Sequence, residues 1–270
     1  MTTDNDEDSD LRILKFFTQL NSLALKKKGR VISILGNHEI MNCQGNMSYV
    51  SFKGLKYFDV GNEEKKGGAG ESIKIKYSLK NGYKKRKSAF KPGGEVASFM
   101  ACTRLSAVII GSLLFVHAGI LPDLSEKISV EDLNKVVTKW LLGKIKYEDK
   151  VPGIGNVKDI LTNYNLSPFW PRVLGNLPTN LDLEDDRCAK HLKPTLKWYK
   201  VNKMVIGHTP QFFTNKLGMN STCSGSVWRI DTGSSDAFNP FDHHPDSKLR
   251  QPQVLEILDD GKEVNILPKE

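Results

Sequence analysis

The sequence predicts an α/β fold, in which short buried strands alternate with amphipathic helices. Four runs of aliphatic and β-branched residues, at 31–35, 107–110, 113–116 and 203–206, have the length and composition of buried strands. Residues 11–28 instead repeat apolar side chains at the spacing of one helix face. Three of the four runs lead directly into a loop that carries a histidine and a glycine, an arrangement typical of α/β proteins with functional loops at strand ends.

Composition places the chain among ordinary globular proteins. Its 270 residues are 39% hydrophobic and 26% charged, which suits a single domain over residues 1–270 with a sizeable core. No apolar stretch reaches the length of a membrane span, and the acidic start MTTDNDEDSD does not resemble a signal peptide. The four cysteines are spaced singly, so we expect no disulfide framework and no cysteine zinc site. A reducing, cytoplasmic location follows as an expectation.

The net charge of +8 raises the question of a nucleic-acid partner. The basic residues concentrate in two runs, Lys26–Lys28 and Lys84–Lys87, and no aromatic residues alternate with them as a base-stacking platform requires. We therefore expect two solvated basic segments, and neither a nucleic-acid nor a membrane partner.

The first predicted helix, residues 11–28, carries Ile13, Phe17 and Leu20 on one face and ends in three lysines before Gly29. Residues 61–94 are rich in glycine and lysine, so we interpret them as an insertion that forms a surface loop from about Glu63 to Lys91. The other predicted elements are a hairpin of 107–110 and 113–116, helices at 129–142 and 192–199, strands at 203–206 and 226–230, and a terminal hairpin of 253–258 and 263–267.

The candidate functional residues lie in three histidine-bearing loops, ILGNHE, LFVHAG and VIGHTP. A glycine beside each histidine allows a sharp turn and close approach of a ligand. Imidazole nitrogens and an amide oxygen are suitable ligands for divalent transition metals. The pattern predicts a metal site at the carboxyl edge of the sheet.

The motifs GNHE at 36–39, VHAG at 116–119 and GHT at 207–209 resemble those of the calcineurin-like metallophosphoesterases, which include the phosphoprotein phosphatases. The longer segments GNHEIMNCQGNMSYV, VIGHTPQ and VWRIDTGSS are similar to the Shewanella-like branch of these phosphatases. The resemblance covers about residues 8–260. It implies a β-sandwich flanked by helices, with its first strands missing, and a serine/threonine phosphatase-like enzyme that hydrolyses phosphomonoesters through a metal-bound hydroxide.

The resemblance also implies roles for individual residues. Asn37, His117 and His208 would bind the second of two metal ions of the manganese, iron or zinc class. His38 would be the general acid that protonates the leaving-group oxygen. Arg172 stands where this branch places a phosphate-binding arginine, although a surface arginine beside a buried tryptophan is an equal alternative.

One departure from the family pattern leaves two readings open. The GDxHG and GDxxDR motifs, which supply the first metal's ligands and the bridging carboxylate, do not occur in the 35 residues before Gly36. The chain is then either an N-terminally truncated phosphatase or a catalytically inactive remnant that binds a partner or a phosphorylated ligand. The expected substrate is a phosphorylated protein or small molecule.

For Asp231, which follows a predicted strand, we expect a structural hydrogen-bonding role.

Overall fold

The computed structural model describes residues 10–59, 71–242 and 250–267, without the side chains of 71–79. The chain divides into two compact units. The described part of the first comprises residues 10–33, 38–59, 71–105 and 138–145, and that of the second comprises 34–37, 106–137, 146–242 and 250–267. Among the described residues, no helix combines the length and the apolar character needed to cross a membrane.

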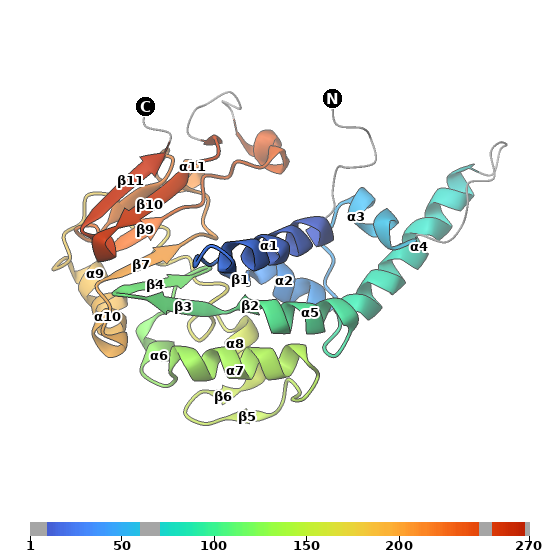
Figure 1. Ribbon diagram of the computed structural model, residues 1–270, viewed down its shortest axis with the longest axis horizontal. Helices are drawn as coiled ribbons and strands as arrows, with labels where there is room; N and C mark the ends of the chain where they lie inside the picture. The colour runs from blue at the N-terminus through green and yellow to red at the C-terminus, as the bar shows by residue number, and fades with distance from the viewer. Residues whose placement is uncertain (1–9, 60–70, 243–249, 268–270) are drawn as a thin grey trace. The chain divides into compact units, whose positions relative to one another are not determined.

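The second unit is built on a five-stranded mixed sheet, seen on the left of Figure 1. Its strands lie in the order β3 (Ala107–Ile110), β4 (Leu113–Val116), β7 (Lys203–Ile206), β9 (Val227–Arg229) and β8 (Asn220–Thr222). The inner three strands run parallel, whereas β3 and β8 are antiparallel to their neighbours. The carboxyl ends of β4, β7 and β9 therefore meet at one edge. The predicted α/β class is confirmed, and so are the hairpin 107–116 and the strand 203–206.

The strands β4 and β7 form the centre of this unit's core. Leu114 and Met204 are fully buried, as is typical of parallel strands covered on both faces. The second unit also contains α6 (Pro122–Ser125), β5 (Lys150–Val151), β6 (Gly155–Asn156), α8 (Val157–Thr162), α9 (Asp186–His191), α10 (Lys193–Tyr199), α11 (Gln211–Thr214), η2 (Asp236–Phe241) and residues 130–137 of α7 (Val130–Leu141), whose last residues belong to the first unit.

The predicted terminal hairpin is also present, as β10 (Val254–Leu258) and β11 (Glu263–Leu267) joined by η4 (Asp259–Gly261). Its turn contacts the turn of the first hairpin, because the Ser112 N–H donates a 2.7 Å hydrogen bond to the Asp260 carboxylate.

The first unit is mainly helical. It contains α1 (Asp10–Leu25), α2 (Asn37–Cys43), α3 (Phe52–Lys56), η1 (Tyr57–Asp59), α4 (Glu71–Phe90), α5 (Glu95–Thr103) and the short pair β1 (Ser33–Ile34) and β2 (Arg104–Leu105), with the unit boundary falling within β1 and after the first residue of α2. The helix predicted at 11–28 is confirmed. The strand predicted at 31–35 is reduced to two residues.

The surface loop predicted from Glu63 to Lys91 is wrong for residues 71–90, which form the helix α4; residues 60–70 lie outside the described part. Arg86 explains the helix, since its side chain is only 1% exposed within a lysine-rich run. Its guanidinium donates to Asn42 Oδ1 at 2.8 Å and to the Asp10 carboxylate, and it lies 4.5 Å from the Phe90 ring centre. These contacts come from distant parts of the chain, so composition alone does not reveal them.

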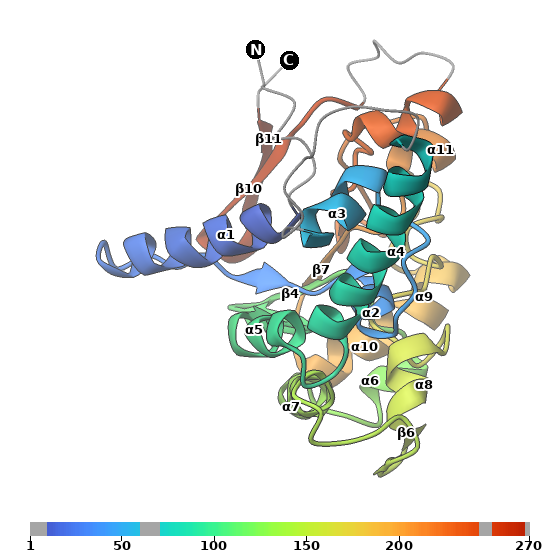
Figure 2. The ribbon, with the colours of Figure 1, turned by 90° about the vertical axis from the view of Figure 1, so that its right-hand side faces the viewer.

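A glycine in α4 gives a testable consequence of this packing. Figure 2 shows α4 beside α3, and an added Cβ at Gly82 would lie 2.1 Å from the Leu55 carbonyl oxygen. Glycine-to-alanine changes in a helix normally stabilise by about 1 kcal/mol. Here we expect Gly82→Ala to lower the free energy of unfolding by about 1–3 kcal/mol, because backbone must move to admit the methyl group.

Urea unfolding of Gly82→Ala and of Lys80→Ala, an exposed position on the same helix, measures the effect. The control should stay within about 0.5 kcal/mol of the parent chain. A Gly82→Ala chain as stable as the parent would show that α4 does not pack on α3 in this way.

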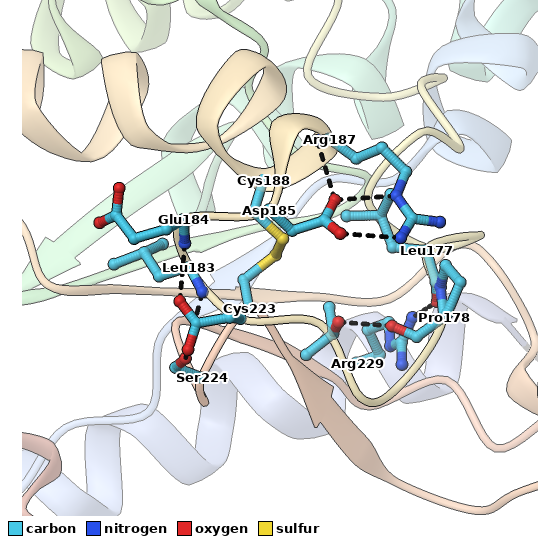
Figure 3. The surroundings of a disulfide bond; sticks show 12 residues. Leu177, Pro178, Leu183, Glu184, Asp185, Arg187, Cys188, Cys223, Ser224 and Arg229 are labelled. Atoms are coloured by element: carbon cyan, nitrogen blue, oxygen red, sulfur yellow. Dashed lines mark hydrogen bonds and ion pairs between the residues drawn. A yellow bond between two sulfur atoms is a disulfide. The ribbon is translucent and has the colours of Figure 1, made fainter.

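The expectation that no disulfide forms is wrong. Cys188 of α9 and Cys223, in the turn between β8 and β9, are fully buried and joined by a disulfide across 35 residues of sequence (Figure 3). The same turn is held by Ser224, whose N–H donates to Leu181 O at 2.9 Å. The spacing of the cysteines in the sequence does not reveal this pair, because the fold, and not the local sequence, brings the two thiols together. One reason for expecting a reducing compartment is thereby removed.

Candidate functional site

Three predicted ligands converge at the carboxyl edge of the parallel strands. His117 Nε2 lies 2.9 Å from Asn37 Oδ1 and 3.1 Å from His208 Nδ1. All three residues belong to the second unit, and Asn37 and His208 are buried. The prediction that the fold brings these three side chains together is confirmed.

The sheet explains how the two histidines meet. His117 directly follows β4, and His208 lies two residues beyond the end of β7, its parallel neighbour. The Gly207 N–H donates to the His117 carbonyl at 2.8 Å, which continues the pairing of the two strands into the loops. Asn37 reaches the same edge from the segment after β1, at the first residue of α2.

His208 adopts a left-handed backbone conformation, with φ of +65°. This conformation costs a non-glycine residue about 1–3 kcal/mol and is found most often where function requires it. Two hydrogen bonds hold the turn: the Thr209 N–H donates to Gly207 O, and Arg172 Nη1 donates to His208 O, both at 2.7 Å. The loop is therefore fixed in a strained form that directs the imidazole toward His117.

The donor set of this cluster fits a divalent cation. Asn37 Oδ1 accepts hydrogen bonds and cannot donate them. If His117 Nε2 donates its one proton to Asn37 Oδ1, that proton is not fully available for a hydrogen bond to His208 Nδ1. A cation instead accepts a lone pair from each of the three atoms. Two ligands about 2.1 Å from an ion and at right angles to each other lie about 3 Å apart, in agreement with the 2.9 and 3.1 Å separations here.

The three donors of the cluster include no carboxylate, and this limits how tightly they can hold an ion. The cluster contains two imidazoles and one amide, and within the described residues no group of three or more histidine, cysteine, aspartate or glutamate side chains is placed to hold a metal. Without a carboxylate, the attraction for a dication comes from the dipoles and lone pairs of neutral ligands alone.

Arg172 lies beside the cluster. Its hydrogen bond to the His208 carbonyl places the guanidinium next to this residue, and the Arg172 N–H donates to the Tyr164 hydroxyl at 2.7 Å. The side chain is exposed. Within the described residues, the bond to the His208 carbonyl is the one hydrogen bond of the Arg172 guanidinium, which carries five N–H donors. An anion can therefore use the remaining donors.

Asp231 lies two residues beyond the end of the third parallel strand, β9, and makes the contacts of a structural residue. Its carboxylate accepts from the Gly233 N–H at 3.0 Å, and its carbonyl accepts from the Gln211 N–H at 2.9 Å. Burial raises the pKa of the Asp231 carboxyl, while the Gly233 hydrogen bond and the charge of Arg172 oppose this rise.

His38 belongs to the first unit, unlike the other predicted site residues. It is exposed in the first turn of α2, and partial burial lowers its pKa. Its ring stacks on Tyr49, with ring centres 4.9 Å apart and planes inclined by 27°. We made no prediction for Tyr49, although it stands within the GNHEIMNCQGNMSYV segment.

Comparison with known proteins identifies the family. The chain is 40% identical over 261 residues to protein R398 of Acanthamoeba polyphaga mimivirus, and the match covers 91% of this chain and 95% of R398. The chain belongs to the family of R398. No family profile matches it.

This R398-family chain is also a relative of the Shewanella-like phosphatases. It is 27% identical to Shewanella-like protein phosphatase 2 of Arabidopsis thaliana, over 84% of this chain and 59% of that protein. Shewanella-like protein phosphatase 1 of Plasmodium berghei is 28% identical, over 83% of this chain and 52% of that protein. The chain thus spans a little over half the length of these phosphatases.

The fold of the R398-family chain matches that of a phosphatase. The crystal structure of the cold-active protein-tyrosine phosphatase of a psychrophilic Shewanella species superposes with a TM-score of 0.56 at 19% sequence identity. The match covers 90% of this chain and 58% of that one. At this identity the likeness establishes a common fold.

Proposed function

We propose that the chain is a metal-dependent phosphoesterase of the protein serine/threonine phosphatase type. One observation carries the proposal: the side chains of Asn37 and His208, both able to ligate a metal, meet around His117 Nε2, and the Arg172 guanidinium donates a hydrogen bond to the His208 carbonyl. The relation to the Shewanella-like phosphatases supports the same class of reaction.

Each residue has a chemical role in this proposal. Asn37, His117 and His208 would hold a divalent ion of the manganese, iron or zinc class, which supplies charge stabilisation at the phosphoryl group and lowers the pKa of water. Arg172 would bind two phosphate oxygens through its planar fork and so orient the phosphorus atom. His38, the residue after Asn37 in the chain, would donate a proton to the departing oxygen of the phosphomonoester.

A second candidate function is phosphate binding without hydrolysis. The donor set of the cluster favours it, because two imidazoles and an amide, without a carboxylate, hold a dication weakly, and a loosely held ion aligns the reacting groups poorly. In this alternative, the chain would bind a phosphorylated ligand or partner through Arg172 and the cluster.

Hydrolysis of p-nitrophenyl phosphate and of phosphoserine and phosphotyrosine peptides, with millimolar Mn²⁺, separates the two. We expect slow, Mn²⁺-dependent turnover with a preference for phosphoserine. Turnover should fall about 10²–10⁴-fold in His38→Ala, and KM should rise in Arg172→Met. Arg187→Met, which alters an exposed arginine paired with Asp185, is the matched control.

Phosphate binding that needs Arg172 but is accompanied by no hydrolysis would favour the second candidate. Turnover unchanged in both His38→Ala and Arg172→Met would contradict the proposed site.

A further inference from the structure

Gln211 bridges the two loops that carry His208 and Arg172. Its side chain is fully buried, and its amide nitrogen donates to Thr209 O at 2.7 Å and to Gly175 O at 3.1 Å. Thr209 directly follows His208, and Gly175 lies three residues after Arg172. A single amide group therefore ties both loops together, and its hydrogen bonds go to backbone carbonyls and not to the proposed ligand atoms.

The bridge extends into a buried polar network. Gln211 Oε1 accepts from Asn220 Nδ2 at 3.1 Å, and Asn220 Oδ1 accepts from Arg229 Nε at 2.7 Å. Arg229, which is 1% exposed, also donates to Gly175 O at 3.4 Å and to Leu177 O. The Gly175 carbonyl thus receives hydrogen bonds from both ends of the network.

The charge of Arg229 distinguishes this network from ordinary core packing. Burial lowers the pKa of Arg229 to about 10, so the group stays charged at neutral pH. Within the described residues its hydrogen-bond partners are an amide and two carbonyls, and no carboxylate forms an ion pair with it. Figure 3 shows its side chain beside Leu177 and Pro178, below the disulfide. Because an unpaired buried charge costs free energy, the network stabilises this loop geometry at the expense of total stability.

The two loops also interlock sterically. A Cβ added at Gly175 would lie 2.3 Å from Thr209 Oγ1 and 2.5 Å from Thr209 Cβ. On the other side, the Asn176 N–H donates to the Arg172 carbonyl at 2.9 Å. A shift of Gly175 would therefore be passed to Arg172 and to the residue after His208 at the same time.

We propose that Gln211, Asn220 and Arg229 are positioning residues that fix the guanidinium of Arg172 relative to the Asn37–His117–His208 cluster, and so set the affinity of the site for a phosphate group. The inference rests on the proposed function. None of the three is a catalytic residue, since Gln211 and Arg229 act through the carbonyls of the loops, and Asn220 acts through the side chains of Gln211 and Arg229.

Binding of inorganic phosphate in the presence of Mn²⁺, measured by calorimetry, tests the role of Gln211. Gln211→Met keeps the length of the side chain and removes the bridge, and we expect affinity to fall about 10- to 100-fold. The matched control is Asn134→Leu, because Asn134 likewise binds backbone groups of Ser106 and Ala107, away from both loops. The control should bind phosphate like the parent chain.

A double-mutant cycle separates positioning from general destabilisation. If Gln211 acts through Arg172, Arg172→Met/Gln211→Met should bind phosphate within about twofold of Arg172→Met alone. A merely structural effect would add to the loss caused by Arg172→Met, and full additivity would overturn the inference. Asn220→Asp is isosteric and removes one of the two donors to Gln211 Oε1, the other being Asn215 Nδ2 at 2.8 Å. It replaces Gln211→Met in the cycle if the latter does not fold.

A parent chain that binds no phosphate would refute the proposed function. In that case a second measurement, which does not depend on phosphate binding, still tests whether Gln211 positions the two loops. Amide hydrogen exchange at Asn176 and Gly207 reports on the two loops, since their N–H groups bond to Arg172 O and His117 O. We expect Gln211→Met to accelerate both, and Asn134→Leu to leave both unchanged. Equal exchange in the two variants would overturn the positioning role.

Discussion

Replacement of His117 by alanine is expected to lower the affinity of the chain for Mn²⁺ by at least about 100-fold. His117 Nε2 is the atom that contacts both other donor atoms, so its loss removes the central one of the three proposed metal ligands and leaves only Asn37 Oδ1 and His208 Nδ1. Removing a residue that merely orients a metal ligand already costs about 10–100-fold in affinity, and removal of a ligand itself should cost at least as much. Calorimetric titration with Mn²⁺ at neutral pH measures the change.

The control for this experiment is His191→Ala, which removes a histidine of α9 in the same unit. It should bind Mn²⁺ like the parent chain. Equal affinity of the parent and His117→Ala would place the bound ion elsewhere, and an equal loss in both variants would indicate general destabilisation.

Loss of the Cys188–Cys223 disulfide is expected to lower the free energy of unfolding by about 3–4 kcal/mol. The bond closes a loop across 35 residues, and a cross-link of this length removes conformational entropy from the unfolded chain. Both sulfur atoms are fully buried, so serine at these positions also leaves polar groups in the core. Urea unfolding of Cys188→Ser/Cys223→Ser without reductant measures the effect.

Cys102→Ser is the matched control, because Cys102 is exposed and outside the disulfide. Its stability should stay within about 0.5 kcal/mol of the parent chain. Thiol titration of the unfolded parent chain should find two free thiols, those of Cys43 and Cys102, and four after reduction. Four thiols before reduction would mean that the disulfide does not form.

The strands of the second unit could be predicted because their signal is local. Each of the runs 107–110, 113–116 and 203–206 is a short aliphatic segment bounded by a turn or a glycine, and each became a strand with the predicted limits. The histidines at the ends of β4 and β7 came together for the same reason, since parallel neighbours end at one edge of a sheet.

The missed features depend on contacts between distant segments. The sequence of α4 has the lysine-rich composition of a loop. The burial of its Arg86 depends on partners that lie 32 to 76 residues away in the sequence. Gln211 and Arg229 lie within the VIGHTPQ and VWRIDTGSS segments, yet their main partners are backbone carbonyls and two asparagines, which leave no pattern in the sequence.

The most direct test of a metal site at Asn37, His117 and His208 is pulsed electron paramagnetic resonance of Mn²⁺ added to the chain labelled with ¹⁵N-histidine. The geometry predicts hyperfine coupling to two histidine nitrogens, from His117 Nε2 and His208 Nδ1. One coupling should disappear in each of His117→Ala and His208→Ala. A spectrum of hydrated Mn²⁺ without nitrogen coupling, or couplings that persist unchanged in both variants, would contradict the account.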